Sequence, residues 1–323
     1  TTIDDPAQYF NTVLYTGDGG SNRSVTVGFQ PNFVWLKERN GTNDHTLFDS
    51  VRGATKRLRA NVNEAEDTQA NQLKSFDSDG FTLGSLSAVN NNGQNYVSWN
   101  WKEDTTAGFD IVTYTGASGD QTFAHSLGVA PEWYLVKERG NVNSWVVNHI
   151  GLANQTNAYL LLNTNDAAGT DSWFNSTAPS SSVVHANDGD SPTNRNGGTY
   201  VMYLWRSVKG FSKFGSYVGN SSTSGTFVYT GFRPAWVMIK RITDTQHWMI
   251  GDNKISPFNP TDNMLKADAN DAEDTDNHVD FLSNGFKNRI TGNAFNNSNS
   301  TYIYMAFAES PFVNSNGVPC NAR

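Results

Sequence analysis

The segment Phe33-Val34-Trp35-Leu36-Lys37 decides the fold of this chain, because it occurs three times. It follows Gly28-Phe29-Gln30-Pro31 and returns, each time shortly after a proline, as Trp133-Tyr134-Leu135-Val136-Lys137 and Trp236-Val237-Met238-Ile239-Lys240. The copies lie about 100 residues apart, and a repeat at a fixed spacing sets the architecture before any residue is considered for chemistry. A residue that occurs in one copy alone is not what the shared fold requires.

The blocks around this segment recur in the same order. Each copy opens with a tyrosine followed two residues later by glycine, at Tyr15, Tyr114 and Tyr217, and closes with an alternating run such as Tyr96-Val97-Ser98-Trp99-Asn100-Trp101. A unit of this length can bury a core of its own. We therefore expect short linkers, a fixed packing of the units, and the following division: arm 1–8, units 9–106, 107–209 and 210–313, and tail 314–323.

Apolar residues alternate with a period of two, which predicts strands. In the closing run, Val97, Trp99 and Trp101 share one face, so we expect a half-buried antiparallel strand there. The run after each proline is apolar on both faces, which predicts a strand covered on both sides. Helical periodicity is limited to 63–73, and Asp79-Gly80 and Asn284-Gly285 predict hairpin turns with positive φ. The expected fold is all-β, with three tandem β-sandwiches of jelly-roll or concanavalin-like type and little helix.

The composition excludes several kinds of partner. The net charge is -8, and the densest basic stretch runs only from Arg52 to Arg59, so we expect no nucleic acid partner. Cys320 is the only cysteine, which leaves no intrachain disulfide. No apolar run approaches the roughly 18 residues that a membrane helix needs, so no membrane insertion is expected.

Motifs for catalysis and for cofactors are missing from the sequence. It has no Gly-x-Ser-x-Gly and no glycine-rich phosphate loop ending in Lys-Ser or Lys-Thr. The histidines lack the spacing of a zinc site, and Asp77-Ser78-Asp79-Gly80 lacks the further ligands of a calcium loop. We expect no enzyme activity, no cofactor and no metal. One structural calcium ion, at this turn or at Asp188-Gly189-Asp190, is the alternative.

Aromatic side chains are the candidates for binding. Trp145 and Trp248, with His45 as their counterpart in the first unit, could line one face of each unit and stack on sugars. The alternative is that they fill the core or the junction between units. Trp173 lies in segment 173–196, which only the second unit has, and segment 253–262 is particular to the third unit. Loops of this kind carry contacts while the repeat carries the fold.

Several segments resemble a known family. They are Ile3-Asp4-Asp5-Pro6 with residues 9–17, Phe48-Asp49-Ser50-Val51-Arg52-Gly53-Ala54, and Ala306-Phe307-Ala308-Glu309. This pattern resembles a domain recurrent in structural proteins of tailed bacteriophages, especially marine ones, and it covers nearly the whole chain. The resemblance implies a virion component, such as a tail fibre, a tail-associated adhesin or a head decoration. It brings no catalytic residues.

The resemblance also sets the expected partners. They are other virion proteins, further copies of the chain, with a trimer as one form, and glycans of the host surface. The chain would assemble in the bacterial cytoplasm and then be exposed on the particle. One alternative is a free lectin, which predicts sugar binding at an exposed aromatic side chain. Another is a glycan depolymerase, which predicts two carboxylates lining one cleft in only one unit.

Overall fold

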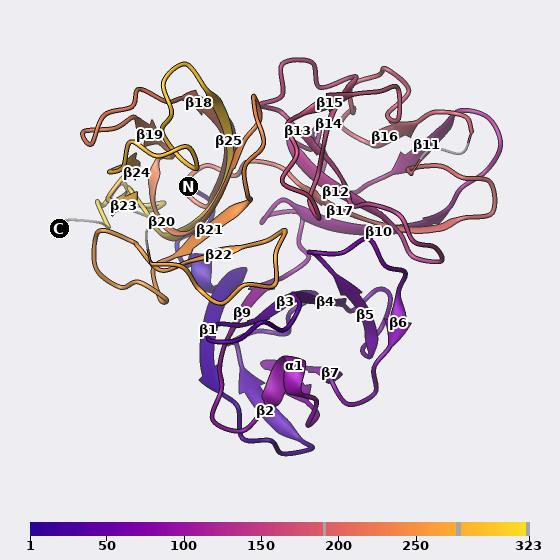
Figure 1. The fold of residues 1–323 in the computed structure, drawn as a ribbon, viewed down its shortest axis with the longest axis horizontal. Coiled ribbons are helices and arrows are strands. Elements are labelled where there is room, and N and C mark those ends of the chain that lie inside the picture. The colour runs from indigo at the N-terminus through magenta and orange to yellow at the C-terminus, as the bar shows by residue number, and fades with distance from the viewer. Residues whose placement is uncertain (190–191, 276–278, 321–323) are drawn as a thin grey trace.

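The computed structural model describes residues 1–189, 192–275 and 279–320, which form an all-β molecule with three lobes (Figure 1). Each of these three parts contains a large and a small antiparallel sheet, so the chain consists of three β-sandwich units, as the repeat predicts. In the described ranges, the helical segments are the 3-10 turn η1 (Pro6–Gln8) and the helix α1 (Ser87–Asn90). None of the described helices has the length and apolarity required to cross a membrane.

The large sheets of the three units have the same strand order, which is β1-β9-β3-β4-β5-β6, then β10-β17-β12-β13-β14-β15, then β18-β25-β20-β21-β22. The first and last strands of each unit therefore pair, and the strand that follows the proline lies beside the last strand. The bounds are β1 (Phe10–Thr16), β3 (Phe33–Glu38), β4 (Thr46–Asp49), β5 (Lys56–Arg59), β6 (Asp67–Thr68), β9 (Asn95–Trp101), β10 (Phe109–Thr115), β12 (Trp133–Glu138), β13 (Val146–His149), β14 (Ala158–Leu161), β15 (Gly169–Thr170), β17 (Thr199–Trp205), β18 (Ser212–Val218), β20 (Phe232–Arg241), β21 (Met249–Asp252), β22 (Met264–Lys266) and β25 (Thr301–Pro311).

The small sheets cover one face of each large sheet. Their orders are β2-β8-β7, β11-β16 and β19-β24-β23. Apolar side chains between the two sheets give each unit a core of its own. The bounds are β2 (Arg23–Thr26), β7 (Leu73–Asp77), β8 (Gly80–Leu83), β11 (Gln121–Ala124), β16 (Val183–Ala186), β19 (Phe227–Tyr229), β23 (Val279–Leu282) and β24 (Gly285–Asn288).

The strand after each proline is buried on both faces, as its sequence predicts. Every residue of β3 is buried, and so is every residue of β12. Val34 and Leu36 pack inside the first sandwich, whereas Phe33 and Trp35 face the other two units. The large sheets thus turn their second faces toward one another and form a fourth core that all three units share.

The closing strand β9 also lies in this shared core, which corrects the expectation of a half-buried strand. Val97, Trp99 and Trp101 belong to the shared core, and the residues between them are buried as well. One unit read alone gives no sign that two others cover its outer face. Aromatic rings cross the junctions, with ring centroids 4.5 Å apart for Phe33 and Tyr203.

Residues 63–73 form no helix, which corrects a second expectation. They contain the short strand β6 and a turn at 70–72, and Glu66 N donates to Arg139 O of the second unit at 2.8 Å, which fixes the backbone across the junction. The short helix α1 lies further along, at a place where the sequence shows no helical periodicity.

The hairpins at Asp79-Gly80 and Asn284-Gly285 form where they are expected, but their glycines have another role. Gly80 and Gly285 begin β8 and β24 and do not adopt positive φ. A Cβ at Gly80 would lie 2.0 Å from Val25 O, and the neighbouring strand leaves as little room at Gly285. Glycine is required here for space and not for its left-handed conformation.

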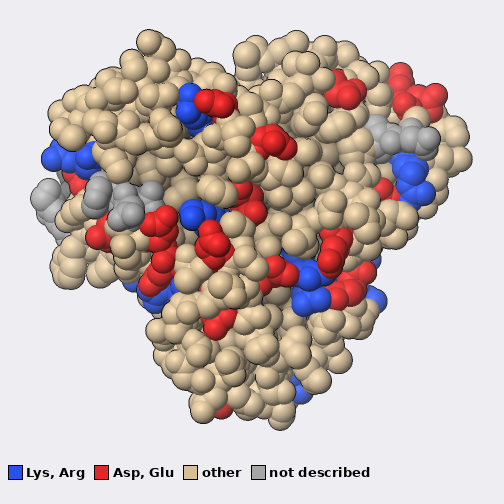
Figure 2. All heavy atoms as spheres, in the orientation of Figure 1, with Lys and Arg blue, Asp and Glu red and all other residues tan. Residues whose placement is uncertain are grey.

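Among the described residues, ion pairs cross two of the three junctions. Arg39 of the first unit pairs with Glu273 of the third, and Arg139 of the second pairs with Glu66 of the first, both at 2.9 Å. At the remaining junction Ala168 and Ile242 stand in place of the glutamate and the arginine, and Ala168 N donates to Ile242 O at 2.9 Å. Figure 2 shows that many charged side chains on the face in view lie along the junctions between the units.

Candidate functional site

Trp145 and Trp248, two of the candidate binding residues, lie at junctions between units. Both are 0% exposed. Trp145 Nε1 donates to Arg59 O of the first unit at 2.8 Å, and Trp248 Nε1 donates to Leu161 O of the second unit at 3.0 Å. Each indole therefore packs at the junction between its own unit and the preceding one.

His45 completes this set of contacts. Its Nδ1 accepts from Trp35 Nε1 at 2.8 Å, so Nε2 carries the proton and donates to Lys266 O of the third unit at 2.9 Å. Burial lowers the pKa of His45 well below its usual range, which keeps the ring neutral. Because the first unit contacts the third, the three equivalent contacts close into a ring. The expectation that these side chains line a sugar-binding face is corrected, since their burial leaves no ring face for a ligand.

A second ring of contacts is made by the position that holds Asp49, His149 and Asp252, whose side chain contacts the following unit and not the preceding one. Asp49 accepts from Tyr203 OH of the second unit at 2.6 Å, and Asp252 accepts from Trp99 Nε1 of the first unit at 3.1 Å. The residue equivalent to Trp99 and Tyr203 in the third unit is Met305, which has no hydrogen-bond donor in its side chain. A carboxylate facing Met305 would find no side-chain donor there.

His149 occupies the position that faces the third unit. Its Nδ1 accepts from Gly151 N at 2.9 Å, so Nε2 donates to the backbone carbonyl of Tyr304 at 3.1 Å. Burial lowers the pKa of His149 to about 3, and the neutral ring still donates to a carbonyl, which a carboxylate cannot do. The difference between His149 and its two aspartate counterparts therefore follows from the partner strand and gives no sign of a metal or catalytic site.

The lysine that ends each repeated run is buried beside a junction. Lys240 Nζ donates to Arg241 O at 2.8 Å and to Asn165 O of the second unit at 3.2 Å. Burial lowers the pKa values of Lys37, Lys137 and Lys240 to about 8. Each of the three ammonium groups bonds to the carbonyl of the following residue, and Lys137 and Lys240 also donate to a carbonyl of the preceding unit.

The other candidate positions are not gathered into one site. Trp173 is half-buried, and its ring lies against Tyr159 with centroids 4.0 Å apart. The carboxylate of Asp77 accepts from the hydroxyls of Ser75 and Thr82, so the hairpin itself uses these oxygens. Asp190, of the second calcium candidate, lies outside the described residues. In the ranges that are described, no group of three or more His, Cys, Asp or Glu is placed to hold a metal.

The strongly exposed aromatic side chains of the described chain all belong to the third unit. Phe227, Tyr229, Phe258 and Phe312 are 44%, 61%, 83% and 37% exposed. Aromatic residues at the repeated positions of the other units are buried in cores. Among the described residues, the exposed aromatic rings are therefore concentrated in the third unit.

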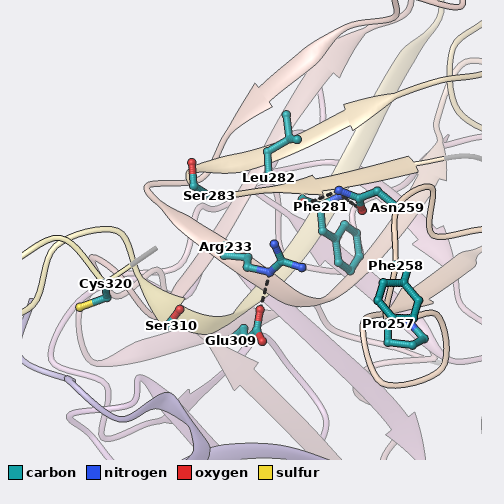
Figure 3. A pocket seen from close by; sticks show the side chains of 10 residues that line it. All are labelled: Arg233, Pro257, Phe258, Asn259, Phe281, Leu282, Ser283, Glu309, Ser310 and Cys320. Atoms are coloured by element: carbon teal, nitrogen blue, oxygen red, sulfur yellow. Dashed lines mark hydrogen bonds and ion pairs between the residues drawn. The ribbon is translucent and has the colours of Figure 1, made fainter. Parts of the chain in front are cut away.

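A groove passes beneath one of these rings, Phe258 (Figure 3). It has two lobes of about 560 and 460 Å³, which share Arg233, Pro257, Phe258 and Glu309. The first lobe extends to the hairpin of the small sheet at residues 281–283. The second extends to the start of the first unit, at residues 7–12, so the groove crosses a junction.

A strand extension found in the third unit alone forms the floor of the groove. β20 has ten residues, whereas β3 and β12 have six. In the additional part, Arg233 pairs with Ser310 in the backbone ladder, and its guanidinium forms an ion pair with Glu309. Figure 3 shows these two charged groups facing each other between the Phe258 loop and the hairpin.

The loop that carries Phe258 is held at both ends. Asn253 N donates to Ala235 O at 2.8 Å. The side chain of Asn259 mimics a strand partner, because its Nδ2 donates to Phe281 O and its Oδ1 accepts from Phe281 N, both at 2.9 Å. These bonds hold Phe258 at the rim although little of its ring is packed.

A family model matches residues 5–311 of the chain, and its description is a domain of unknown function (DUF7483). The chain belongs to the DUF7483 family. The match spans all three sandwiches, so the DUF7483 domain here is the ring of units with its shared core and not a single sandwich. No curated protein matches the chain.

Comparison of the repeats identifies only part of the groove in this DUF7483 chain. Segment 253–262 stands out because the other units lack it, and it carries Phe258. The repeat comparison did not predict a binding role for Arg233 or Glu309. A signal for Arg233 exists, because Gln30 and Ala130 stand at the same place in the Gly-x-x-Pro block of the other units.

Proposed function

We propose that this DUF7483 chain is a structural protein of a tailed-bacteriophage virion, of tail-fibre, appendage or head-decoration type, which also contacts host-surface glycans. The ring of three sandwiches around one core is the observation that carries the proposal. A closed ring resists rearrangement, because moving one unit breaks contacts with both others. The family resemblance of the sequence supplies the virion context. Other virion proteins and further copies of the chain are the proposed partners.

The chemistry of the chain suits this role. The shared core and the hydrogen bonds across the junctions stabilise the body without a disulfide, and Cys320 is the only cysteine. Disulfides do not persist in a reducing cytoplasm, where virions of this kind assemble. A body stabilised by packing alone would fold there and keep its structure after release.

Binding without cleavage is favoured over depolymerase activity. Glycoside hydrolysis generally uses two carboxylates on either side of the bond, and among the described residues that line the groove there is one, Glu309. A pair of carboxyl groups, Glu103 and Asp110, lies outside the groove. Asp110 is 6% exposed and accepts from Ser126 N, and Glu103, in the linker between the first two units, accepts from Ile111 N.

The decisive experiment locates the chain. Antibodies against the recombinant protein should label purified particles of a phage that encodes it, and immunogold microscopy should place the label on a tail or head surface. Mass spectrometry of washed particles should find the chain at a fixed copy number. A chain that is abundant in infected cells but absent from washed particles would contradict the proposal. The exposed groove would then favour the free lectin.

A further inference from the structure

We propose that the groove beside Phe258 binds a neutral, linear saccharide, with sugar residues on both sides of the Phe258 ring. This inference rests on the proposed function only for the source of the saccharide, which is the host surface. The binding itself is argued from the shape, the polar groups and the charge of the groove.

The shape of the groove suits a chain-like ligand. Each lobe, at about 560 and 460 Å³, falls within the roughly 300 to 1,000 Å³ of ordinary ligand sites. The lobes meet at Pro257 and Phe258, so a ligand that fills both must pass the aromatic ring. It would contact the first unit as well as the third, because Asn11 and Thr12 line the second lobe.

The polar groups of the groove suit hydroxyls. Arg233 offers donors and Glu309 offers acceptors side by side, an arrangement that can bind two neighbouring hydroxyls. Asn253 lines the second lobe and adds a polar side chain to it.

The ring of Phe258 supplies the apolar contact. It is 83% exposed, yet the loop around it is fixed by backbone and side-chain bonds. A rigid aromatic side chain at a groove rim gives up little conformational freedom when a ligand packs on it. Sugar rings present a face of C–H groups that can pack against such a ring.

The charge of the groove favours a neutral ligand. The guanidinium of Arg233 is already paired with Glu309. The ammonium of Lys254 donates to Asn11 Oδ1 at 2.7 Å and to Thr12 O at 2.6 Å. An acidic saccharide would have to compete with Glu309 for the charge of Arg233 and with Asn11 and Thr12 for the ammonium of Lys254, whereas a neutral one leaves these contacts in place.

The test uses the full chain and defined polysaccharides. Dextran, mannan and galactan serve as neutral probes, and alginate and polygalacturonate as acidic probes, each immobilised for surface plasmon resonance. We expect retention on at least one neutral probe. Phe258→Ala should weaken that binding at least about tenfold, a change that corresponds to about 1.4 kcal/mol. Its melting temperature should stay that of the parent chain, which shows that the variant folds.

Tyr229→Ser is the matched control, because Tyr229 is an exposed aromatic of the same unit outside the groove. It should leave binding unchanged. Retention on the acidic probes alone, retention on none of the five, or equal loss in both variants would overturn the proposal. If the chain is found in particles but binds no probe, the saccharide proposal fails and the virion role stands. If the chain binds a neutral probe but is absent from particles, the virion role fails and the saccharide site stands.

Discussion

The outer face of the small sheet is polar in the first unit and aromatic in the third. Strands β2 and β19 are equivalent edge strands, each paired with the second strand of the following hairpin. Ser24 and Thr26 point outward from β2, where Phe227 and Tyr229 point outward from β19, and the inward residue between them is valine in both. Positions that face a core are thus shared between units, and positions that face solvent have diverged. In the described chain, this divergence leaves exposed aromatic side chains on the small sheet of the third unit.

The largest expected effect tests the shared part of this comparison. Trp99→Ala removes a fully buried indole from the core that all three units share. We expect a loss of about 3 to 5 kcal/mol in the free energy of unfolding. Guanidinium denaturation should show one transition shifted as a whole, because each unit depends on this core. Two separate transitions, with the second and third units unchanged, would show that the sandwiches are independent.

The next effect tests a difference between units that the structure explains. His149→Asp gives the second unit the residue that the other two carry, yet the equivalent position of the partner strand is Met305, whose side chain has no hydrogen-bond donor. A buried carboxylate facing the carbonyl of Tyr304 should lower the free energy of unfolding by about 1 to 3 kcal/mol.

Denaturation at pH 7 measures this loss. His149→Asn is its control, because the amide can donate to the same carbonyl and should cost less. A stabilised His149→Asp chain would refute the assignment of this contact.

A smaller effect concerns the position two residues after the closing aromatic of each unit. Glu309 faces the groove there in the third unit, whereas Glu103 is half-buried in the first. Burial and the neighbouring Asp110 raise the pKa of Glu103 to about 7, from 4.5 in an exposed chain. The folded state therefore holds this proton more tightly than the unfolded state. Its contribution to stability falls as the pH rises between these two values.

Glu103→Gln should remove this dependence. The variant should equal the parent chain in stability at pH 5 and exceed it at pH 8, because only the parent must then hold a poorly solvated carboxylate. Urea denaturation at both pH values measures the two differences. An identical difference at both would mean that Glu103 ionises in the fold as it does in water.

The smallest effect concerns one turn position, at which the first unit has Asp79 and the third has Asn284. Asp79→Asn places in the first unit the residue that Asn284 supplies in the third. Since Asp79 is exposed, we expect a change within about 0.5 kcal/mol. The melting temperature with and without added calcium should be the same in both chains. A calcium-dependent rise that the substitution abolishes would restore the calcium site at this turn.

Local patterns predicted much of the fold. Alternation in 96–101 and apolar runs after Pro31, Pro131 and Pro234 predicted the strands, and the repeat predicted three sandwiches, because strand periodicity is a local property. The roles of Trp145 and Trp248 could not be derived in this way. A buried indole at a junction and an exposed indole at a binding face have the same sequence neighbours. Arg233 and Glu309 are 76 residues apart, and only the pairing of β20 with β25 brings them together.

The sequence by itself determined the number of units, their strands and the sites where the units differ, since each follows from spacing and from side-chain alternation. The tertiary structure decided what the second face of each large sheet meets. That face packs on two other units, so residues that look available for a ligand seal the ring instead. It also decided that the paired strands β20 and β25, the loop at 253–262 and strand β1 of the first unit line one groove. Contacts of this kind depend on segments that are distant along the chain, and no local pattern of residues records them.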